Sequence, residues 1–320
     1  ALTCNMHAAV VGFTMDDPAA SLAGKKRIAA LTVEERKLIA AGVSEPGTSS
    51  LILGPTYVPA VQARRTRGGY SLRGRKAFLS MLEGCDYISL LAHPEEDTNP
   101  LASMLFLVPR SAHGQHVEEV WDTLGMRGTR SNNLILEDCV VPAENCLGST
   151  DNFLMWFESL PQWGFGSYTA VYLGVAAAAY RQACEVLKQR VPRGFTQPLS
   201  YHPDIRRRVA EMSVDLEAAR LLMYHAAWLV DTLGVTPEST VALMRAKYFV
   251  GEAVTRITRS AITACGAHAL FKTSRLEQLF RDGASAPLQP PAGDACLTGI
   301  GMLELGLEPT EMLPPLKVKG

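Results

Sequence analysis

The chain has 320 residues, enough to bury a large core, and 47% of them are hydrophobic and 20% charged, as in a globular protein. Its 31 basic and 32 acidic side chains leave a formal net charge of −1, so no overall field attracts nucleic acid or an anionic membrane. No apolar run reaches the length of a membrane span. The seven cysteines are scattered and lack a C-x-x-C pair, which predicts reduced thiols in a cytoplasmic protein. The histidines show no metal-ligand spacing, so we expect no metal site.

Residues 1–40 carry apolar side chains at helical intervals, first around Ala8 to Val11 and then over 27–39. Asp16-Asp17-Pro18 separates the two runs and predicts a break between two helices. From Gly42 to Gly148 the pattern changes to short β-rich runs punctuated by Gly, Pro, Asp and Asn, which predicts an antiparallel sheet. The clearest predicted strands cover residues 87–91, 104–108 and 133–136.

After Asn152 the helical period returns, and several long helices with short connections predict a four-helix bundle. Thr236 and Pro237 fit the N-cap and first turn of one helix. The predicted helices cover residues 169–188, 204–233, 237–264, 274–280 and 294–305. The fold class is therefore α+β, with a partial helical domain over 1–40, a β-domain over 41–150 and a bundle over 151–320.

Two segments in the β-domain have the composition of a cofactor site. Residues 42–50 read Gly-Val-Ser-Glu-Pro-Gly-Thr-Ser-Ser, and residues 76–80 read Lys-Ala-Phe-Leu-Ser. A turn formed by Pro and Gly at the end of a strand leaves N–H groups and hydroxyls without hydrogen bonds to a neighbouring strand. These groups can bind the edge of a ring or a phosphate. Taken alone, the first segment is equally well a simple turn, and Phe78 a core aromatic.

Both segments resemble the acyl-CoA dehydrogenase family, in which a Thr-Glu-Pro-Gly-x-Gly-Ser loop and a Lys-x-Trp-Ile-Thr strand bracket the isoalloxazine ring of FAD. Residues 125–131, 136–148, 266–269 and 279–282 resemble further family motifs in the same order. The resemblance runs from about residue 40 to about residue 305 and includes the order of helices, sheet and bundle.

The resemblance implies a set of FAD-binding residues. Val43, Ser44 and Ser50 match the loop that meets the flavin edges, and Ser50 also matches a position near the pyrophosphate and the substrate. Phe78, Leu79 and Ser80 match the Trp-Ile-Thr strand, so an aromatic plane and a hydroxyl are kept. Phe195 and Gly266 match positions where a partner subunit holds the adenosine diphosphate. There, however, Thr263 replaces the family's Gln and Ala267 its second Gly.

The family's catalytic glutamate is missing from its usual place. That base takes the α-proton of the acyl thioester while the flavin accepts the β-hydride, and it follows the Arg-Asp pair in a Tyr-Glu-Gly-Thr turn. Residues 283–292 contain no carboxylate here, and neither do residues 161–167, where some relatives carry the base. Asp294 is the nearest replacement, although the N-cap of the following helix is the more ordinary role for it.

These features predict FAD-dependent α,β-dehydrogenation of an acyl-CoA or acyl-carrier thioester, with electrons passed to a separate acceptor. A flavin monooxygenase or oxidase of the same fold needs no such base and is one alternative. A non-catalytic subunit of a hetero-oligomer is another. We expect a homodimer or homotetramer formed through the bundle, or a heteromer with a related subunit. Because the family's N-terminal domain is represented only in part and the chain begins at Ala1, we also expect the sequence to be a fragment.

Overall fold

The computed structural model describes residues 1–47 and 59–307. These residues form two compact units. The sheet unit comprises Ala1–Asp122 and Arg127–Gly164, and the helical unit comprises Thr123–Met126 and Phe165–Leu307. This division into two units does not test the domain limits that we predict at residues 40 and 150, which stay predictions.

The sheet unit is built on a single sheet with the strand order β6-β7-β3-β2-β4-β5-β8 and with β1 added against β4. Most neighbouring strands are antiparallel, but β1 and β2 both run parallel to β4, which departs from the purely antiparallel sheet that the sequence predicts. The three clearest predicted strands are confirmed within β4, β5 and β7. The strands are β1 (Ile39–Gly42), β2 (Gln62–Thr66), β3 (Gly69–Leu79), β4 (Tyr87–Pro94), β5 (Ser103–Pro109), β6 (Gln115–Glu118), β7 (Asn132–Pro142) and β8 (Cys146–Thr150).

Strand β5 shows why the sheet is buried on both faces. Its even-numbered residues, such as Phe106, belong to one apolar cluster, and its odd-numbered residues, such as Leu105, belong to another, because successive side chains point to opposite faces. The Tyr70 ring of β3 lies 5.0 Å from the Phe106 ring, edge to face, although two strands separate β3 from β5 in the sheet. The sheet therefore curves around the first cluster.

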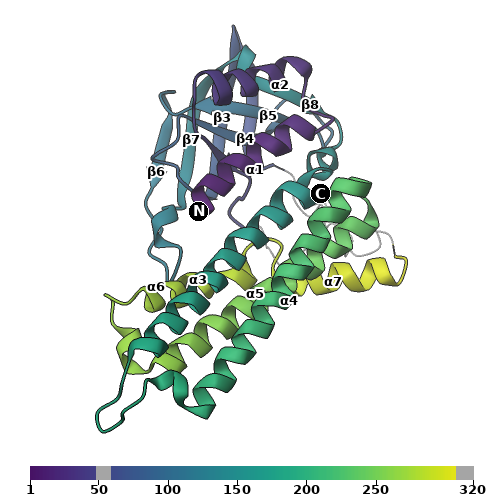
Figure 1. Ribbon diagram of the computed structural model, residues 1–320. Coiled ribbons are helices and arrows are strands. Elements are labelled where there is room, and N and C mark those ends of the chain that lie inside the picture. The colour runs from purple at the N-terminus through teal and green to yellow at the C-terminus, as the bar shows by residue number, and fades with distance from the viewer. Residues whose placement is uncertain (48–58, 308–320) are drawn as a thin grey trace. The chain divides into compact units, whose positions relative to one another are not determined.

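Two N-terminal helices, α1 (Leu2–Asp16) and α2 (Leu22–Ala29), cover the other face, where Val10 and Ile28 join the second cluster (Figure 1). The break at Asp16-Asp17-Pro18 is confirmed. The helix predicted over 27–39 is wrong at both ends. It begins at Leu22, continues as a π-helical turn over Ala30–Glu34, and stops before Ile39, which pairs with β4 as the first residue of β1. Ile39 is buried by strand pairing, which the helical apolar period does not reveal.

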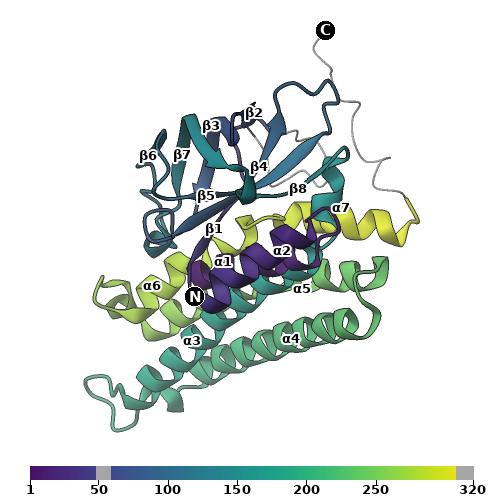
Figure 2. The same ribbon diagram turned by 90° about the horizontal axis from the view of Figure 1, so that it is seen from above.

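The helical unit contains the bundle that the sequence predicts. Figure 2 shows α3, α4 and α5 running lengthwise beside one another. Alanines at the helix contacts, among them Ala179, Ala219 and Ala253, are fully buried and let the helix axes come close. The helices are α3 (Ser167–Gln189), α4 (Pro203–Leu233), α5 (Pro237–Cys265), α6 (Arg275–Gly283) and α7 (Gly293–Glu304).

Thr236 is the N-cap of α5, as predicted, and forms a capping box with Ser239. The first segment of the helical unit in sequence, Thr123–Met126, packs against α6. The Met126 N–H donates to Asp282 Oδ1 at 2.7 Å, and Arg281 Nη1 donates to the Leu124 carbonyl at 3.1 Å. A Cβ atom added at Gly125 would lie 2.0 Å from the Arg281 carbonyl oxygen, so only glycine fits there.

Candidate functional site

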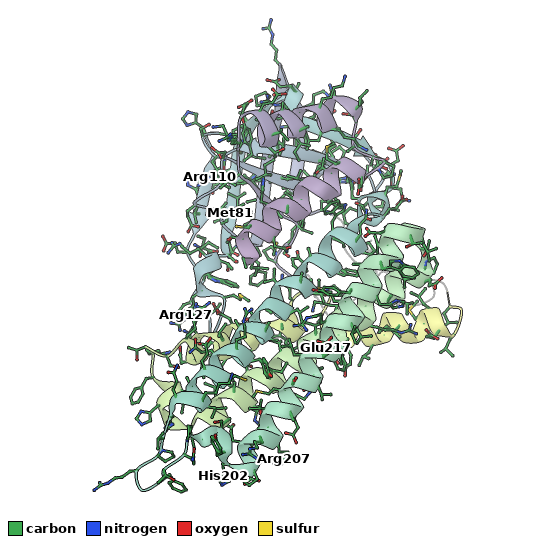
Figure 3. The ribbon with its side chains drawn as sticks, viewed as in Figure 1. Met81, Arg110, Arg127, His202, Arg207 and Glu217 are labelled. Atoms are coloured by element: carbon green, nitrogen blue, oxygen red, sulfur yellow. The ribbon has the colours of Figure 1, made fainter. Side chains whose placement is uncertain are left out.

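The end of β3 is distorted. Its pairing with β7 shifts register between Lys76 and Leu79. Phe78, within this bulge, has φ +57°. Met81, labelled in Figure 3, lies just past the strand and has φ +62°. Both are non-glycine residues in the left-handed region, a costly conformation that persists only where the surroundings enforce it and that clusters at functional sites.

The bulge turns Phe78 outward, so that 61% of this residue is exposed while Leu79 next to it is fully buried. The Phe78 ring meets the Trp121 ring edge to face, with 6.1 Å between centroids. An exposed aromatic surface held in a strained backbone is suited to cover a flat ligand ring.

Three buried hydroxyls gather behind Phe78. Ser80 Oγ lies 2.8 Å from Ser131 Oγ, which in turn lies 2.8 Å from Thr129 Oγ1. The Met81 N–H donates to the Thr129 carbonyl at 2.8 Å and fixes the two segments together. Each hydroxyl can donate one hydrogen and accept others, so the chain of hydroxyls can orient the Ser80 O–H toward a bound acceptor.

The loop at residues 43–47 joins the same end of β3. The Ala77 N–H donates to the Ser44 carbonyl at 2.9 Å. Val43 is 44% exposed and Ser44 is half-buried, whereas Glu45 is buried and pairs with Lys76. Burial lowers the pKa of Lys76, against the opposing pull of the Glu45 carboxylate. Ser50, the remaining predicted residue of this loop, lies outside the described residues.

The predicted adenosine-binding residues lie in the helical unit. Phe195 is 66% exposed in the connection between α3 and α4, and Gly266 follows α5 with φ +76°, a conformation that favours glycine. Arg190 Nη1 donates to the Cys265 carbonyl at 2.5 Å, which brings the C-terminal ends of α3 and α5 together. Phe195 and Gly266 thus follow two helix ends that are joined by a hydrogen bond.

The turn over residues 283–292 is held by three polar contacts from helices of the same unit. Lys247 Nζ donates to the Ala286 carbonyl at 3.0 Å, the Tyr172 hydroxyl donates to Gln289 Oε1 at 3.3 Å, and Cys296 Sγ lies 3.7 Å from the Pro291 carbonyl. Burial lowers the pKa of Lys247 to about 8 and raises that of Cys296 to about 11. The turn itself presents no carboxylate.

Asp294 is exposed in the first turn of α7, and its expected role as the N-cap is wrong. The N-cap is Ala292 and makes no side-chain hydrogen bond, so the helix begins one residue before Asp294. Ala292 itself is extended, with φ −63° and ψ 160°, and Gly293 is the first helical residue. Asp294 is placed to interact with the helix dipole, and its catalytic role stays a prediction.

The structure thus brings Val43, Ser44, Phe78, Leu79 and Ser80 to one end of β3. The helical unit carries Phe195, Gly266 and Asp294. Sequence reasoning missed four polar side chains at the β3 end: Glu45, Lys76, Thr129 and Ser131. Glu45 and Lys76 were visible as opposite charges within the two motifs, but nothing in the sequence marked them as buried.

Within residues 1–47 and 59–307, no three His, Cys, Asp or Glu side chains gather closely enough to hold a metal ion. Among the helices described here, none is both long and apolar enough to cross a membrane.

Comparison with known proteins agrees with this arrangement. The middle-domain model of the acyl-CoA dehydrogenases matches residues 40–139, and the C-terminal-domain model matches residues 166–287. A curated cyclohexane-1-carbonyl-CoA dehydrogenase of Syntrophus aciditrophicus is 30% identical over 80% of this chain and 64% of its own length. An L-prolyl-[peptidyl-carrier protein] dehydrogenase of Pseudomonas fluorescens is 27% identical over 67% of this chain and 55% of its own.

Among solved structures, the butyryl-CoA dehydrogenase of Megasphaera elsdenii superposes with a TM-score of 0.83 at 24% identity, covering 95% of this chain and 77% of that one. The chain spans 61% to 65% of the length of the first curated relatives that it matches. Two family models in chain order, together with the shared fold, establish that the chain belongs to the acyl-CoA dehydrogenase family.

Proposed function

We propose that this chain belongs to an FAD-dependent oxidoreductase that introduces an α,β double bond into an acyl thioester. The observation that carries the proposal is the strained bulge of β3, where Phe78 is exposed at φ +57° beside the Ser80 hydroxyl. Such strain is retained when it serves a site, and it falls on the segment that resembles the flavin-binding strand of the family.

The residues at this end of β3 fit an isoalloxazine ring in their chemistry. Phe78 offers an aromatic surface, Ser44 and Ser80 offer hydroxyls, and Val43 contributes exposed backbone and side chain. Phe195 and Gly266 would hold the adenosine end for a second copy of the chain. Bound FAD would supply the acceptor for the substrate's β-hydride.

The protein's own share of the reaction is to orient the thioester and to remove its α-proton. Without a carboxylate in the turn over 283–292, Asp294 is the residue that we propose as a base, and absence of a positioned base costs about 10² to 10⁴ in rate. We propose an acyl-CoA or acyl-carrier-protein thioester as the substrate and a separate molecule as the electron acceptor. The relatives' names include both CoA and carrier-protein thioesters.

Purified protein should take up FAD and show the visible spectrum of a bound flavin. Anaerobic addition of acyl-CoA thioesters of several chain lengths, and of an acyl-carrier thioester, should then bleach the flavin band. A protein that binds no FAD on titration would contradict the flavin site and support a non-catalytic subunit.

The carboxylate-free turn favours one second candidate, a monooxygenase or oxidase of the same fold, since that chemistry needs no base for the α-proton. The two candidates separate in one pair of measurements. In a dehydrogenase, a thioester bleaches the flavin band. In a monooxygenase or oxidase no thioester bleaches it, but the protein consumes oxygen once its flavin is reduced.

A further inference from the structure

The buried ion pair between Glu45 and Lys76 joins the two segments at the β3 end. The Glu45 carboxylate comes from the loop at 43–47 and the Lys76 ammonium from β3, with 2% and 0% of their side chains exposed. The neighbouring residues Ser44 and Ala77 are also joined, by a backbone hydrogen bond. Two links, one between side chains and one between backbones, therefore hold the two segments together.

The second carboxylate oxygen extends this link. Glu45 Oε2 accepts a hydrogen bond from the Ala60 N–H at 2.7 Å. One buried carboxylate therefore holds Lys76 of β3 and the chain that leads into β2, in addition to its own loop. Next to Ala60, Val61 packs so closely on Gly74 that an added Cβ at Gly74 would lie 2.8 Å from Val61 Cα.

A buried ion pair is weak evidence for stability, because taking both charges out of water offsets much of their attraction. Apolar side chains of similar size would fill the same space at no such cost. What the ion pair adds is a fixed register, since a charge-assisted hydrogen bond has one favourable geometry whereas apolar contacts can slide. The segments held in register are the ones that carry Val43 and Ser44 on one side and Phe78 and Ser80 on the other.

We infer that Glu45 and Lys76 are a pair of positioning residues for the flavin site, which keep the loop and the bulged strand at the spacing that the ring requires. This inference rests on the proposed function. Neither side chain contacts the ligand, because both are buried beneath the segments that do. They act through the backbone of Ser44 and through the bulge that follows Lys76.

The test replaces the pair in the full chain and measures FAD binding separately from folding. The double variant E45L/K76M removes both charges and leaves apolar side chains of similar length. We expect its urea midpoint to fall only modestly, because the Ala60 N–H loses its acceptor on Glu45. Its Kd for FAD, measured by quenching of flavin fluorescence, should rise at least about tenfold. The absorption bands of the flavin that still binds should lose resolution, because the ring is held less uniformly.

A neighbouring ion pair on the same strand provides the control. Arg75 of β3 pairs with Glu118 of β6, but 44% and 39% of these side chains are exposed. The matched variant R75M/E118L should leave FAD affinity and spectrum unchanged. Should E45L/K76M fail to fold, E45Q/K76M serves instead, since it keeps an acceptor for the Ala60 N–H while removing both charges.

The outcomes are distinguishable. A folded E45L/K76M or E45Q/K76M protein that binds FAD with the wild-type Kd and spectrum overturns the positioning role and leaves the flavin site intact. An equal loss of FAD in the R75M/E118L control also overturns it, because charge removal anywhere on β3 would then suffice. A wild type that takes up no FAD removes the proposed function and this inference with it.

Discussion

Ser80 illustrates how one hydroxyl serves both the fold and the candidate site. It is buried and bonded to Ser131, yet it sits next to the exposed, strained Phe78 segment. If Thr129 donates to Ser131 and Ser131 donates to Ser80, the Ser80 hydrogen is left to point toward the flavin.

Substituting Ser80 by Ala should weaken FAD binding about fivefold, the effect of one hydrogen bond worth about 1 kcal/mol. Fluorescence titration of the apoprotein measures the change. Ser71→Ala is the matched control, because Ser71 is buried on the same strand but bonds Asp138 at 3.3 Å. Equal affinities for wild type and Ser80→Ala would exclude a direct role for this hydroxyl.

Asp294 is the second residue that can be tested alone. As an exposed acid in the first turn of α7 it interacts favourably with the helix dipole, which is worth about 0.3 to 1 kcal/mol. Asp294→Asn should therefore change the unfolding midpoint little but slow thioester-driven flavin reduction by at least about 10²-fold, if this carboxylate takes the proton. Glu304→Gln at the other end of the helix should leave that rate unchanged. A wild-type reduction rate in Asp294→Asn would assign the base to another residue.

At the scale of elements, the sequence predicts the side-chain capping of some helix N-termini but not of others. Thr236 caps α5 with its side chain, whereas Ser274 stands at the N-cap of α6 without a side-chain hydrogen bond. The same residue class at the same position thus has two different energetic roles.

Replacing Thr236 by Ala should cost about 1 kcal/mol of unfolding free energy, since it removes the hydroxyl that accepts from the Ser239 N–H in the first turn. Ser274→Ala should cost almost nothing. Urea denaturation of both variants, followed by circular dichroism, gives the comparison. A cost for Ser274 that matches the cost for Thr236 would show that the cap in α5 contributes no special stabilisation.

Much of the fold could be predicted because its elements are long and periodic. The bundle helices and the strands β4, β5 and β7 follow directly from the apolar pattern. Ile39 could not be assigned, because it is buried through parallel pairing with β4, where its partner Tyr87 is 48 residues away. The same limit applies to the site: charged residues such as Glu45 and Lys76 are expected at the surface until their partner across the fold is known.

For the whole molecule, α4 presents an apolar stripe that suits association with a second copy. Val214, Leu221 and Trp228 are spaced seven residues apart, and each is more than half exposed. Charged side chains border the stripe: Arg207 stands in line with it, seven residues before Val214, and Glu217 lies between Val214 and Leu221 in sequence (Figure 3). Such a surface on one helix can pair with itself across a two-fold axis.

Light scattering at micromolar concentration should therefore show a dimer or tetramer. The double variant Leu221→Lys/Trp228→Lys should shift it toward a monomer, since it places charges in the stripe. Leu22→Lys, an equally exposed apolar position in the sheet unit, is the control. A wild-type monomer, or a double variant that stays assembled, would contradict association through α4.

Lys247 makes the stability of the whole chain depend on pH. Burial lowers its pKa from 10.5 to about 8, so between these values the unfolded chain binds more protons than the folded one. Stability should rise with pH across this window, by on the order of 3 kcal/mol, relative to Lys247→Met, in which this group no longer titrates. Urea midpoints of both proteins at pH 7 and pH 10 measure the effect. Contributions from buried thiols other than Cys296, whose pKa Lys247 itself lowers, cancel in the difference. Parallel pH profiles for the two proteins would contradict this assignment.

The segment Thr123–Met126 has a consequence for how the chain can be dissected. It lies between β6 and β7 in sequence, yet it supplies Met126 N–H and the Leu124 carbonyl as partners for Asp282 and Arg281 of α6. A cut at Gly164 therefore cannot release an intact helical half, since the excised piece would lose those four residues. Asp282 would then lose the Met126 N–H and Arg281 the Leu124 carbonyl. A protein that contains the helical half alone, or that exchanges it with the helical half of a relative, must therefore include residues 123–126 together with the helices.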